Sequence, residues 1–76
     1  MEKQIIEILT SLRPEFDFSQ DINFIEEGML DSFDVISLVN ALDEKFQISI
    51  DGTDILPENF SSLDSIKNLL KKKGIE

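Results

Sequence analysis

The sequence predicts an all-α fold, a small bundle of three main helices and one short helix, built from residues 1–76 as a single domain. Apolar residues recur at steps of three and four in three segments, which is the spacing of amphipathic helices. The one segment that alternates like a strand, residues 47–52, has no pairing partner nearby. With 76 residues, of which 41% are hydrophobic and 30% charged, the chain can form one small core.

The first predicted helix covers residues 2–13, where isoleucines and leucines form one apolar stripe. Pro14 ends this helix, because the residue before a proline is disfavoured in the α region. The connection that follows is longer than the usual length of about four to six residues. It covers residues 14–31 and contains seven apolar side chains, so we expect it to fold over the helices as a compact loop. These side chains are Phe16, Phe18, Ile22, Phe24, Ile25, Met29 and Leu30.

The second predicted helix gives the clearest pattern in the sequence. Asp31 is a good N-cap, and Asp34 stands three residues further on, in a carboxylate variant of the capping box. Phe33 and Ile36 lie off the core face of this helix, and two interpretations stay open for them: a wide buried face, or apolar groups with a use outside the core. The core face itself consists of Val35, Leu38, Val39, Leu42 and Phe46.

The rest of the chain predicts a connector and a final helix. We expect residues 47–52 to be an extended connector that places apolar side chains in the core, and residues 57–60 to form a single helical turn with proline at its first position. Either Ser61 or Ser62 caps the last helix, and Gly74 ends it after three lysines that complement the helix dipole. Its apolar face consists of Leu63, Ile66, Leu69 and Leu70.

The composition excludes several kinds of chemistry. The chain has no cysteine and no histidine, so it has no disulfide, thiol nucleophile, imidazole ligand or catalytic triad. Neither Gly28 nor Gly52 lies in the oxygen-ligand pattern of a calcium loop, and no phosphate loop of the Walker type is present. Paired carboxylates such as Glu26 and Glu27 have no predicted pocket around them. We therefore expect a protein with no catalytic activity and no metal site of its own.

The negative charge is concentrated in the middle of the chain. The net charge is −9, and residues 15–51 carry all of it, with ten acidic residues and only Lys45 as a base. Such a field repels nucleic acid and anionic membranes and can steer basic protein partners, although a solvated surface that aids solubility has the same composition. No apolar run approaches the roughly 18–20 residues of a membrane span, and the first residues lack a signal-peptide pattern. We expect a cytoplasmic monomer.

Ser32 is the candidate functional residue. It opens the best-patterned helix, directly after a loop that contains Gly28. The N-terminus of a helix favours an attached phosphate through its free N–H groups and its dipole. With no base at hand, a serine is a poor nucleophile, so a reaction there needs a partner enzyme. These features predict a site of enzymatic modification, with a second capping hydroxyl as the alternative interpretation.

The sequence Leu-Asp-Ser-Phe-Asp at residues 30–34, followed by an amphipathic helix, resembles the phosphopantetheine attachment motif of acyl carrier and peptidyl carrier proteins. In that motif an Asp-Ser pair precedes a large apolar residue. The resemblance extends over essentially the whole chain, from the opening helix and the long loop to a second helix ending in Asp-Glu-Lys-Phe at residues 43–46. It implies an acyl-carrier-like helical bundle.

The resemblance implies that Ser32, with Asp31 beside it, receives 4'-phosphopantetheine from coenzyme A on a magnesium-dependent phosphopantetheinyl transferase. The thiol of this arm then holds an acyl or aminoacyl group as a thioester, which fits a chain without cysteine. A loading ligase supplies that group, and acyl-transferring enzymes receive it.

The resemblance also implies a partner surface. Phe33 matches the bulky apolar residue that contributes to docking, and Ile36, one turn beyond Ser32, is placed to flank the arm. Acidic positions around the second helix meet basic patches on partner enzymes in this family. In this sequence they are Asp31, Asp34, Asp43 and Glu44.

Ser37 and Asn40 depart from the pattern of fatty-acid carriers, many of which have an acid and an apolar residue in mid-helix. Residues 28–32, Gly-Met-Leu-Asp-Ser, are closer to stand-alone peptidyl and D-alanyl carriers, and residues 55–60 resemble carriers loaded by adenylating ligases. A D-alanyl or peptidyl carrier is therefore the alternative within the family. An unmodified acidic helical adaptor that binds through Phe33 and Ile36 is the alternative from another class.

Overall fold

The computed structural model describes residues 1–75, which form three α-helices and two single turns of 3-10 helix, with no strand among them. In chain order these are α1 (Glu2–Leu12), α2 (Ser32–Phe46), η1 (Gly52–Asp54), η2 (Pro57–Asn59) and α3 (Leu63–Lys72). The all-α fold predicted from the sequence is confirmed. The short fourth helix is the single turn η2, with Pro57 at its start as predicted, whereas the η1 turn was not predicted.

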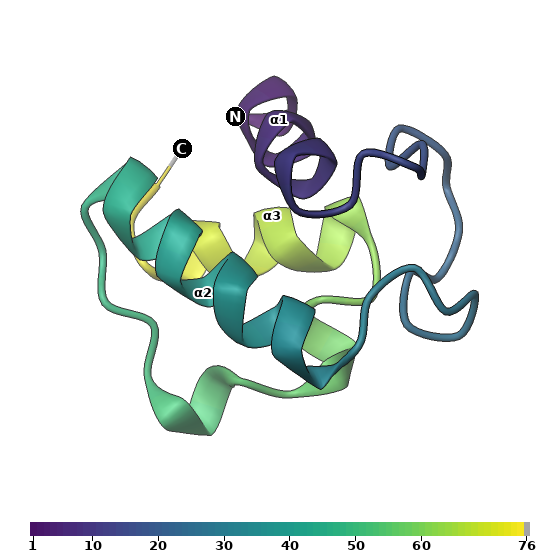
Figure 1. Ribbon diagram of the computed structural model, residues 1–76. Coiled ribbons are helices and arrows are strands. Elements are labelled where there is room, and N and C mark those ends of the chain that lie inside the picture. Colours follow the sequence, from purple (N-terminus) through teal and green to yellow (C-terminus); the bar gives the residue numbers. More distant parts are fainter. Residues whose placement is uncertain (76) are drawn as a thin grey trace.

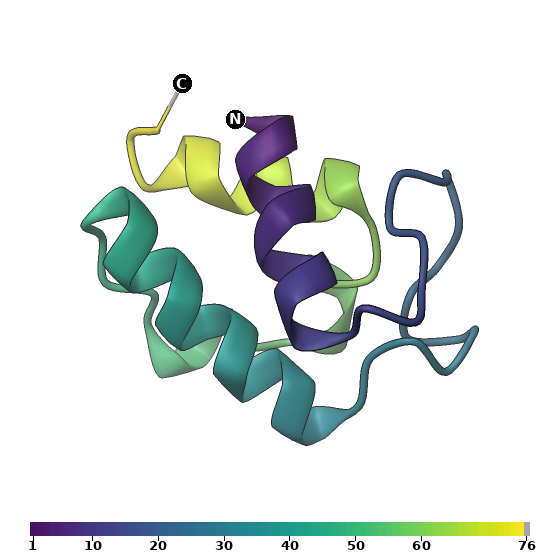
Figure 2. The same cartoon turned by 45° about the horizontal axis from the view of Figure 1, so that its top comes forward.

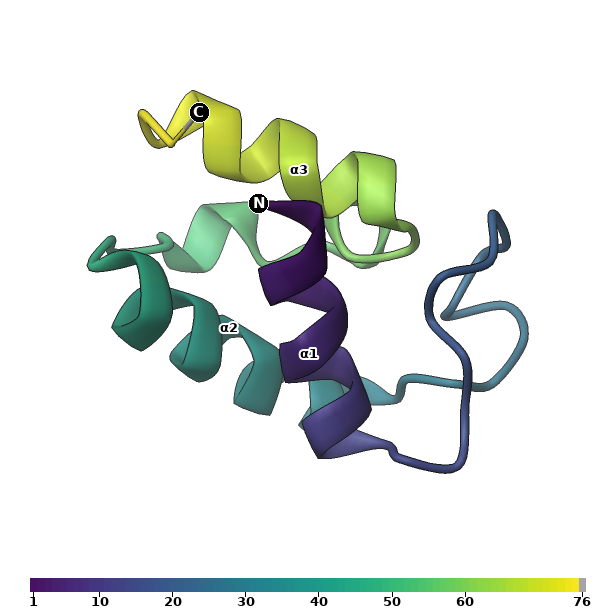
Figure 3. The same ribbon diagram turned by 90° about the horizontal axis from the view of Figure 1, so that it is seen from above.

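Helix α1 packs against both α2 and α3. It lies across one side of these two helices, and the connection of residues 47–62 runs along their other side (Figures 1 and 3). The long loop of residues 14–31 covers the end where α1 stops and α3 begins (Figure 2). The start of α2, where this loop arrives, is therefore bordered by the end of α1 and by the 47–62 connection.

The core contains only hydrophobic side chains among the described residues. The predicted apolar faces of α2 and α3 are confirmed, except that Phe46 is half-buried, because α2 ends there and the chain turns away at Gln47 in a left-handed conformation. Phe33 is 83% exposed and Ile36 50% exposed, so the wide buried face that the sequence left open for them is wrong. The side chains with no exposed surface are Ile5, Leu9, Phe18, Phe24, Leu38, Leu42, Phe60, Ile66 and Leu70.

The predicted compact loop is organised around Phe24. The N–H of Phe24 donates to the carbonyl oxygen of Ser61 at 2.7 Å, and its own carbonyl oxygen accepts from the N–H groups of Met29 and Leu30 at 2.8 and 3.2 Å. Its ring packs edge-on against Phe18, with the centroids 5.1 Å apart. Gly28 turns the chain with a φ of +74°, which glycine adopts without steric cost. The loop is thus fixed to the start of α3 and delivers the chain to Asp31 in a defined direction.

The predicted capping box at the start of α2 is confirmed. Asp31 is the N-cap, and its Oδ1 accepts from the N–H of Asp34 at 2.9 Å. The Oδ2 of Asp34 accepts in return from the N–H of Asp31 at 3.1 Å. At α3, Ser62 rather than Ser61 is the N-cap, since its Oγ accepts from the N–H of Ser65.

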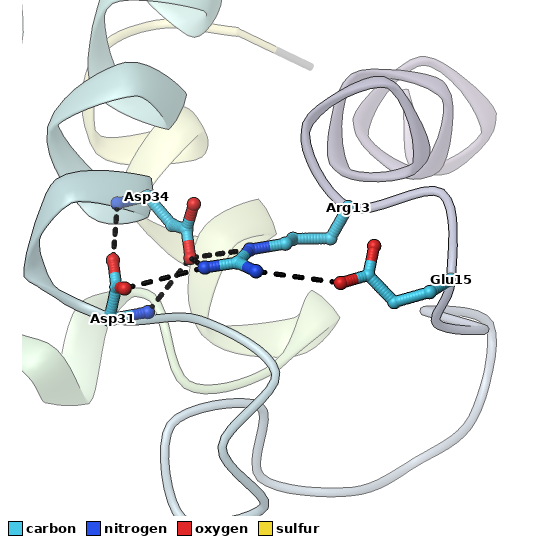
Figure 4. A network of polar contacts seen from close by, with 4 residues as sticks. All are labelled: Arg13, Glu15, Asp31 and Asp34. Carbon is cyan, nitrogen blue, oxygen red and sulfur yellow. Dashed lines mark hydrogen bonds and ion pairs between the residues drawn. The ribbon is translucent and has the colours of Figure 1, made fainter.

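Arg13, directly after α1, links the end of that helix to the start of α2 (Figure 4). Its Nε and Nη2 lie 2.9 and 2.8 Å from Oδ2 of Asp34, and Nη2 also lies 3.3 Å from Oδ2 of Asp31. Its Nη1 donates to Glu15 at 3.4 Å. One guanidinium therefore neutralises part of the negative charge of three carboxylates and holds two helix ends together.

This ion-pair network shifts the ionisation of its members. The hydrogen bond from Arg13 holds the pKa of Asp34 below its ordinary value, against a smaller opposing effect of desolvation. The same hydrogen bond raises the pKa of Arg13 above its ordinary value. Asp34 and Arg13 therefore remain charged throughout the neutral range.

We predict that Asp34→Asn lowers the free energy of unfolding by about 1 kcal/mol at pH 7, the value of a charge-assisted hydrogen bond reduced for solvent screening. That corresponds to a melting temperature lower by about 4–8 °C in a domain of this size. Because the folded-state pKa of Asp34 is depressed, its stabilisation is present above the unfolded value of about 3.9 and is lost as the pH falls through the folded-state pKa. Wild type and variant should therefore converge in stability in acid.

Thermal melts from pH 7 down to acid test this prediction. Asp21→Asn is the matched control, since Asp21 is an exposed loop carboxylate whose removal changes the net charge equally. A stability difference between wild type and Asp34→Asn that stayed constant with pH, or that Asp21→Asn reproduced, would contradict the assignment to Arg13.

Candidate functional site

Ser32 is the first residue of α2 and is exposed. Its Oγ makes no hydrogen bond with any described residue, and the side-chain cap of α2 is supplied by Asp31 instead. The alternative interpretation of Ser32 as a second capping hydroxyl is therefore wrong. The hydroxyl thus has no hydrogen-bonding task in the described part of the chain, and the chain has no histidine that could act as its base.

The first turn of α2 has room for an anion beside this hydroxyl. Within residues 1–75 the backbone N–H groups of Ser32 and Phe33 have no acceptor, whereas those of Asp34 and Val35 donate to Asp31. Unpaired N–H groups and the positive end of the helix dipole favour a phosphate. The carboxylates of Asp31 and Asp34 would repel it, and Arg13, which contacts both, offsets part of their charge (Figure 4).

A groove of about 380 Å³ begins at Ser32, and we call it the Ser32 groove. Helix α2 forms one wall with Val35 and Ile36, and the segment after η1 forms the opposite wall with Ile55 and Pro57. Its volume lies within the range of about 300–1,000 Å³ that is usual for small-molecule sites. The remaining lining residues are Ile25, Leu30 and Asp31.

The exposed face of α2 carries Phe33, Ile36 and Glu44, with Asn40 among them. Steps of three, four and four residues place these four side chains on one side of the helix. We call this set the outward stripe. It combines the two most exposed apolar side chains of the described residues with a carboxylate at its far end.

The other predicted docking acids are placed differently. The side chain of Asp34 is only 14% exposed because it faces Arg13. Asp43 is half-buried, and its Oδ1 accepts from the N–H of Ile50 at 2.9 Å, which fixes the start of the 47–62 connection. Asp31 and Glu44 are exposed. Three of the acids grouped by the sequence analysis thus hold the fold: Asp34, Asp43 and Asp31, which is exposed yet caps α2 and pairs with Arg13. Glu44 faces solvent with no such contact among residues 1–75.

Sequence reasoning did not single out Arg13, Ile55 or Pro57 as site residues. Arg13 is the only arginine of the chain, and this feature of the composition could have drawn attention to it. Ile55 and Pro57 lie in a segment without helical or strand periodicity, so no pattern in the sequence indicated which helix they would face.

Two further properties bear on the kind of site. No group of three or more acidic side chains within residues 1–75 is arranged to hold a metal ion. No helix in the described part of the chain has the length and apolar character needed to cross a membrane.

Comparisons with known proteins agree with this geometry. Residues 3–70 match the protein family described as "Phosphopantetheine attachment site". The D-alanyl carrier proteins of Lactococcus lactis subsp. cremoris strains MG1363 and SK11 are each 28% identical to this chain over 78 residues, covering 100% of the chain and 99% of the relative. No solved structure matches the chain at a significant level.

The residues at the start of α2 fit a phosphopantetheine group. A phosphodiester needs a free hydroxyl, space for an anion and room for the arm that follows. Ser32 provides the hydroxyl, the first turn of α2 provides unpaired N–H groups, and the Ser32 groove provides the space. The match to the family covers most of the chain, including all of α1 after Glu2, all of α2 and the groove. The chain therefore belongs to the phosphopantetheine attachment site family of carrier proteins, and its cofactor is covalently attached 4'-phosphopantetheine.

Proposed function

We propose that this protein is an acyl carrier protein that holds an acyl or aminoacyl group on a 4'-phosphopantetheine arm attached to Ser32. The observation that carries the proposal is the Ser32 hydroxyl, which is exposed, makes no hydrogen bond among residues 1–75 and lies at the first position of α2. When bound, the arm supplies a thiol on which the group is held as a thioester. The protein itself has no catalytic role in this proposal.

Ser32 differs from the other seven serines of the chain in position and in contacts. The hydroxyl groups of Ser19, Ser61, Ser62 and Ser65 are engaged in hydrogen bonds within the fold. The remaining three lie within α1, within α2 or in the 47–62 connection, away from any helix N-terminus: Ser11, Ser37 and Ser49. Ser32 alone combines an unengaged hydroxyl with the first turn of a helix among the described residues.

Attachment needs a partner enzyme. The Oγ of Ser32 forms a new bond to the phosphorus next to pantetheine in coenzyme A, and the bond from that phosphorus to the nucleotide part breaks. The proton of the hydroxyl must go to a base. The chain has no histidine, and the nearby Asp34 is paired with Arg13, so the base belongs to the transferase.

The outward stripe supports docking of this transferase, of a loading ligase and of acyl-transferring enzymes. Phe33 and Ile36 are exposed directly beside Ser32, and exposed apolar side chains rimmed by polar ones are typical of interaction sites. Asp31 and Glu44 add negative charge at the two ends of α2. Asp34 and Asp43 contribute to the same field from partly buried positions, and a basic partner surface complements it.

For the cargo, we propose an aminoacyl group such as D-alanine, loaded by an adenylating ligase. The relatives that span the whole chain are D-alanyl carrier proteins by name. The Ser32 groove is small and lies at the surface, between α2 and the segment of Ile55 and Pro57. A short cargo can remain at the mouth of such a groove without displacing any core side chain.

We predict that wild-type protein incubated with coenzyme A, magnesium and a phosphopantetheinyl transferase of broad specificity gains the mass of one phosphopantetheine, and that Ser32→Ala gains none. The stability of Ser32→Ala should stay within about 0.5 kcal/mol of wild type, because Asp31 still caps α2. Ser37→Ala, an exposed serine on the same helix, is the control and should be modified normally. An unmodified wild-type protein would favour the acidic adaptor instead.

Reversing the charge of Glu44 tests the docking surface. We expect Glu44→Lys to slow association with the transferase about three- to tenfold at low ionic strength. The difference should shrink as salt is added, since the screening length falls from about 10 Å at 0.1 M to about 3 Å at 1 M. Glu7→Lys makes the same charge change on α1, outside the outward stripe, and should have a smaller effect. Equal slowing by both variants would show that only net charge matters.

A third prediction concerns the cargo. The modified protein, incubated with ATP, D-alanine and a D-alanine-adenylating ligase, should gain one alanyl group that hydroxylamine removes, as expected for a thioester. The unmodified protein is the control and should gain none. Loading by fatty-acyl substrates alone, with no alanyl group accepted, would contradict the aminoacyl assignment.

A further inference from the structure

The wall of the Ser32 groove opposite α2 is poorly anchored by apolar packing. It belongs to the stretch between Ile50 and Phe60, both of which are buried. None of the nine residues between them is buried, and Ile55 is only partly covered. Polar contacts must therefore make up many of the interactions that hold this wall in place.

Asp54 is the centre of these polar contacts. Its carbonyl oxygen accepts from the N–H of Leu56 at 2.9 Å and from Nδ2 of Asn59 at 2.7 Å. Its N–H donates to the carbonyl oxygen of Asp51 at 2.9 Å. Asp54 thus joins η1 to η2 through its backbone. The Leu56 N–H that donates to Asp54 belongs to the residue between the two groove residues, Ile55 and Pro57.

The side chain of Asp54 connects this segment to α3. Nζ of Lys73, at the end of α3, lies 2.6 Å from Oδ2 of Asp54 and 3.3 Å from Oδ2 of Asp51. The side chains of Lys73 and Asp54 are 21% and 27% exposed, so water screens their interaction less than that of a fully exposed pair. We call these three residues the Lys73 cluster. Its two ion pairs are the only ones among residues 1–75 that join the segment between Ile50 and Phe60 to the end of a helix.

Lys73 and Asp54 stay charged around neutral pH. The hydrogen bond to Asp54 raises the pKa of Lys73, with that to Asp51 second. The same hydrogen bond from Lys73 is the largest cause of the lowered pKa of Asp54. Both groups remain ionised under ordinary conditions, so the contact persists.

We infer that Lys73 and Asp54 are positioning residues for the phosphopantetheine arm, because they hold the Ile55–Pro57 wall against α3 and so set the groove that begins at Ser32. This inference rests on the proposed attachment to Ser32. Neither residue lines the groove, so both act through Ile55 and Pro57. Loss of the ion pair should loosen the wall and leave the arm less firmly placed along α2.

The first test measures the wall without any arm. In unmodified Lys73→Gln, hydrogen exchange of the Leu56 N–H should be about two- to fivefold faster than in wild type, the effect of losing a partly exposed ion pair on local opening. Exchange in α1 and α2 should not change. Lys71→Gln removes the same charge from an exposed position of α3 and should behave as wild type, whereas Lys73→Arg should restore slow exchange.

The second test measures the arm itself. Conversion of wild type to the modified form should shift the methyl resonances of Ile36 and Ile55, one on each wall of the groove. These shifts should fall by about half or more in Lys73→Gln and recover in Lys73→Arg, while the modification by transferase proceeds in all three proteins.

Each outcome bears on a different claim. Unchanged exchange at Leu56 in Lys73→Gln, or faster exchange throughout the protein, overturns the role of Lys73 in holding the wall. Faster exchange with undiminished methyl shifts overturns the link from wall to arm. A wild-type protein that takes up no phosphopantetheine refutes the proposed function and, with it, the positioning of the arm. In that case the hydrogen-exchange data still show whether Lys73 holds the wall.

Discussion

Three donors converge on one oxygen, Oδ2 of Asp34, and the geometry of the site depends on that convergence. Two come from the guanidinium of Arg13 and one is the N–H of Asp31. The contact joins the end of α1 to the first turn of α2 across 21 residues of sequence. The same network engages the carboxylates of Asp31 and Asp34, whereas the hydroxyl of Ser32 has no hydrogen-bond partner among residues 1–75. A capped helix start with an unengaged hydroxyl is what an anionic group needs for covalent attachment.

The sides of α2 have separate tasks, and this separation explains how a 76-residue chain can both fold and present a docking surface. One side packs in the core, one faces α1 with Asp34, one faces the 47–62 connection with Asp43, and the outward stripe faces solvent. Because the Phe33 side chain is exposed, it lowers solubility and contributes nothing to the core. In the proposed function its exposure has a use, because partner enzymes must reach Ser32 from that direction.

Most of the fold, and the position of the candidate residue Ser32 at the start of α2, could be predicted from the sequence because both depend on local patterns. Helical periodicity predicted α1, α2 and α3, and residue types at fixed offsets predicted the capping box of Asp31 and Asp34. Contacts between distant segments could not be predicted in this way. The partnership of Arg13 with Asp34, and the closure of the groove by Ile55 and Pro57, depend on how loops without periodicity cross the helices. For the same reason Asp34 and Asp43 were grouped with the exposed acids, although each binds a group elsewhere in the fold.

The most direct test of the account is to locate the attached group within the chain. Wild-type protein modified with coenzyme A would be digested, and its fragments sequenced by tandem mass spectrometry, so that all eight serines are distinguished. The account predicts that the group is found on Ser32 and on no other residue. Among residues 1–75, this serine alone combines a hydroxyl without a hydrogen bond with the capped start of a helix. Modification of another serine, or of several without preference, would contradict it.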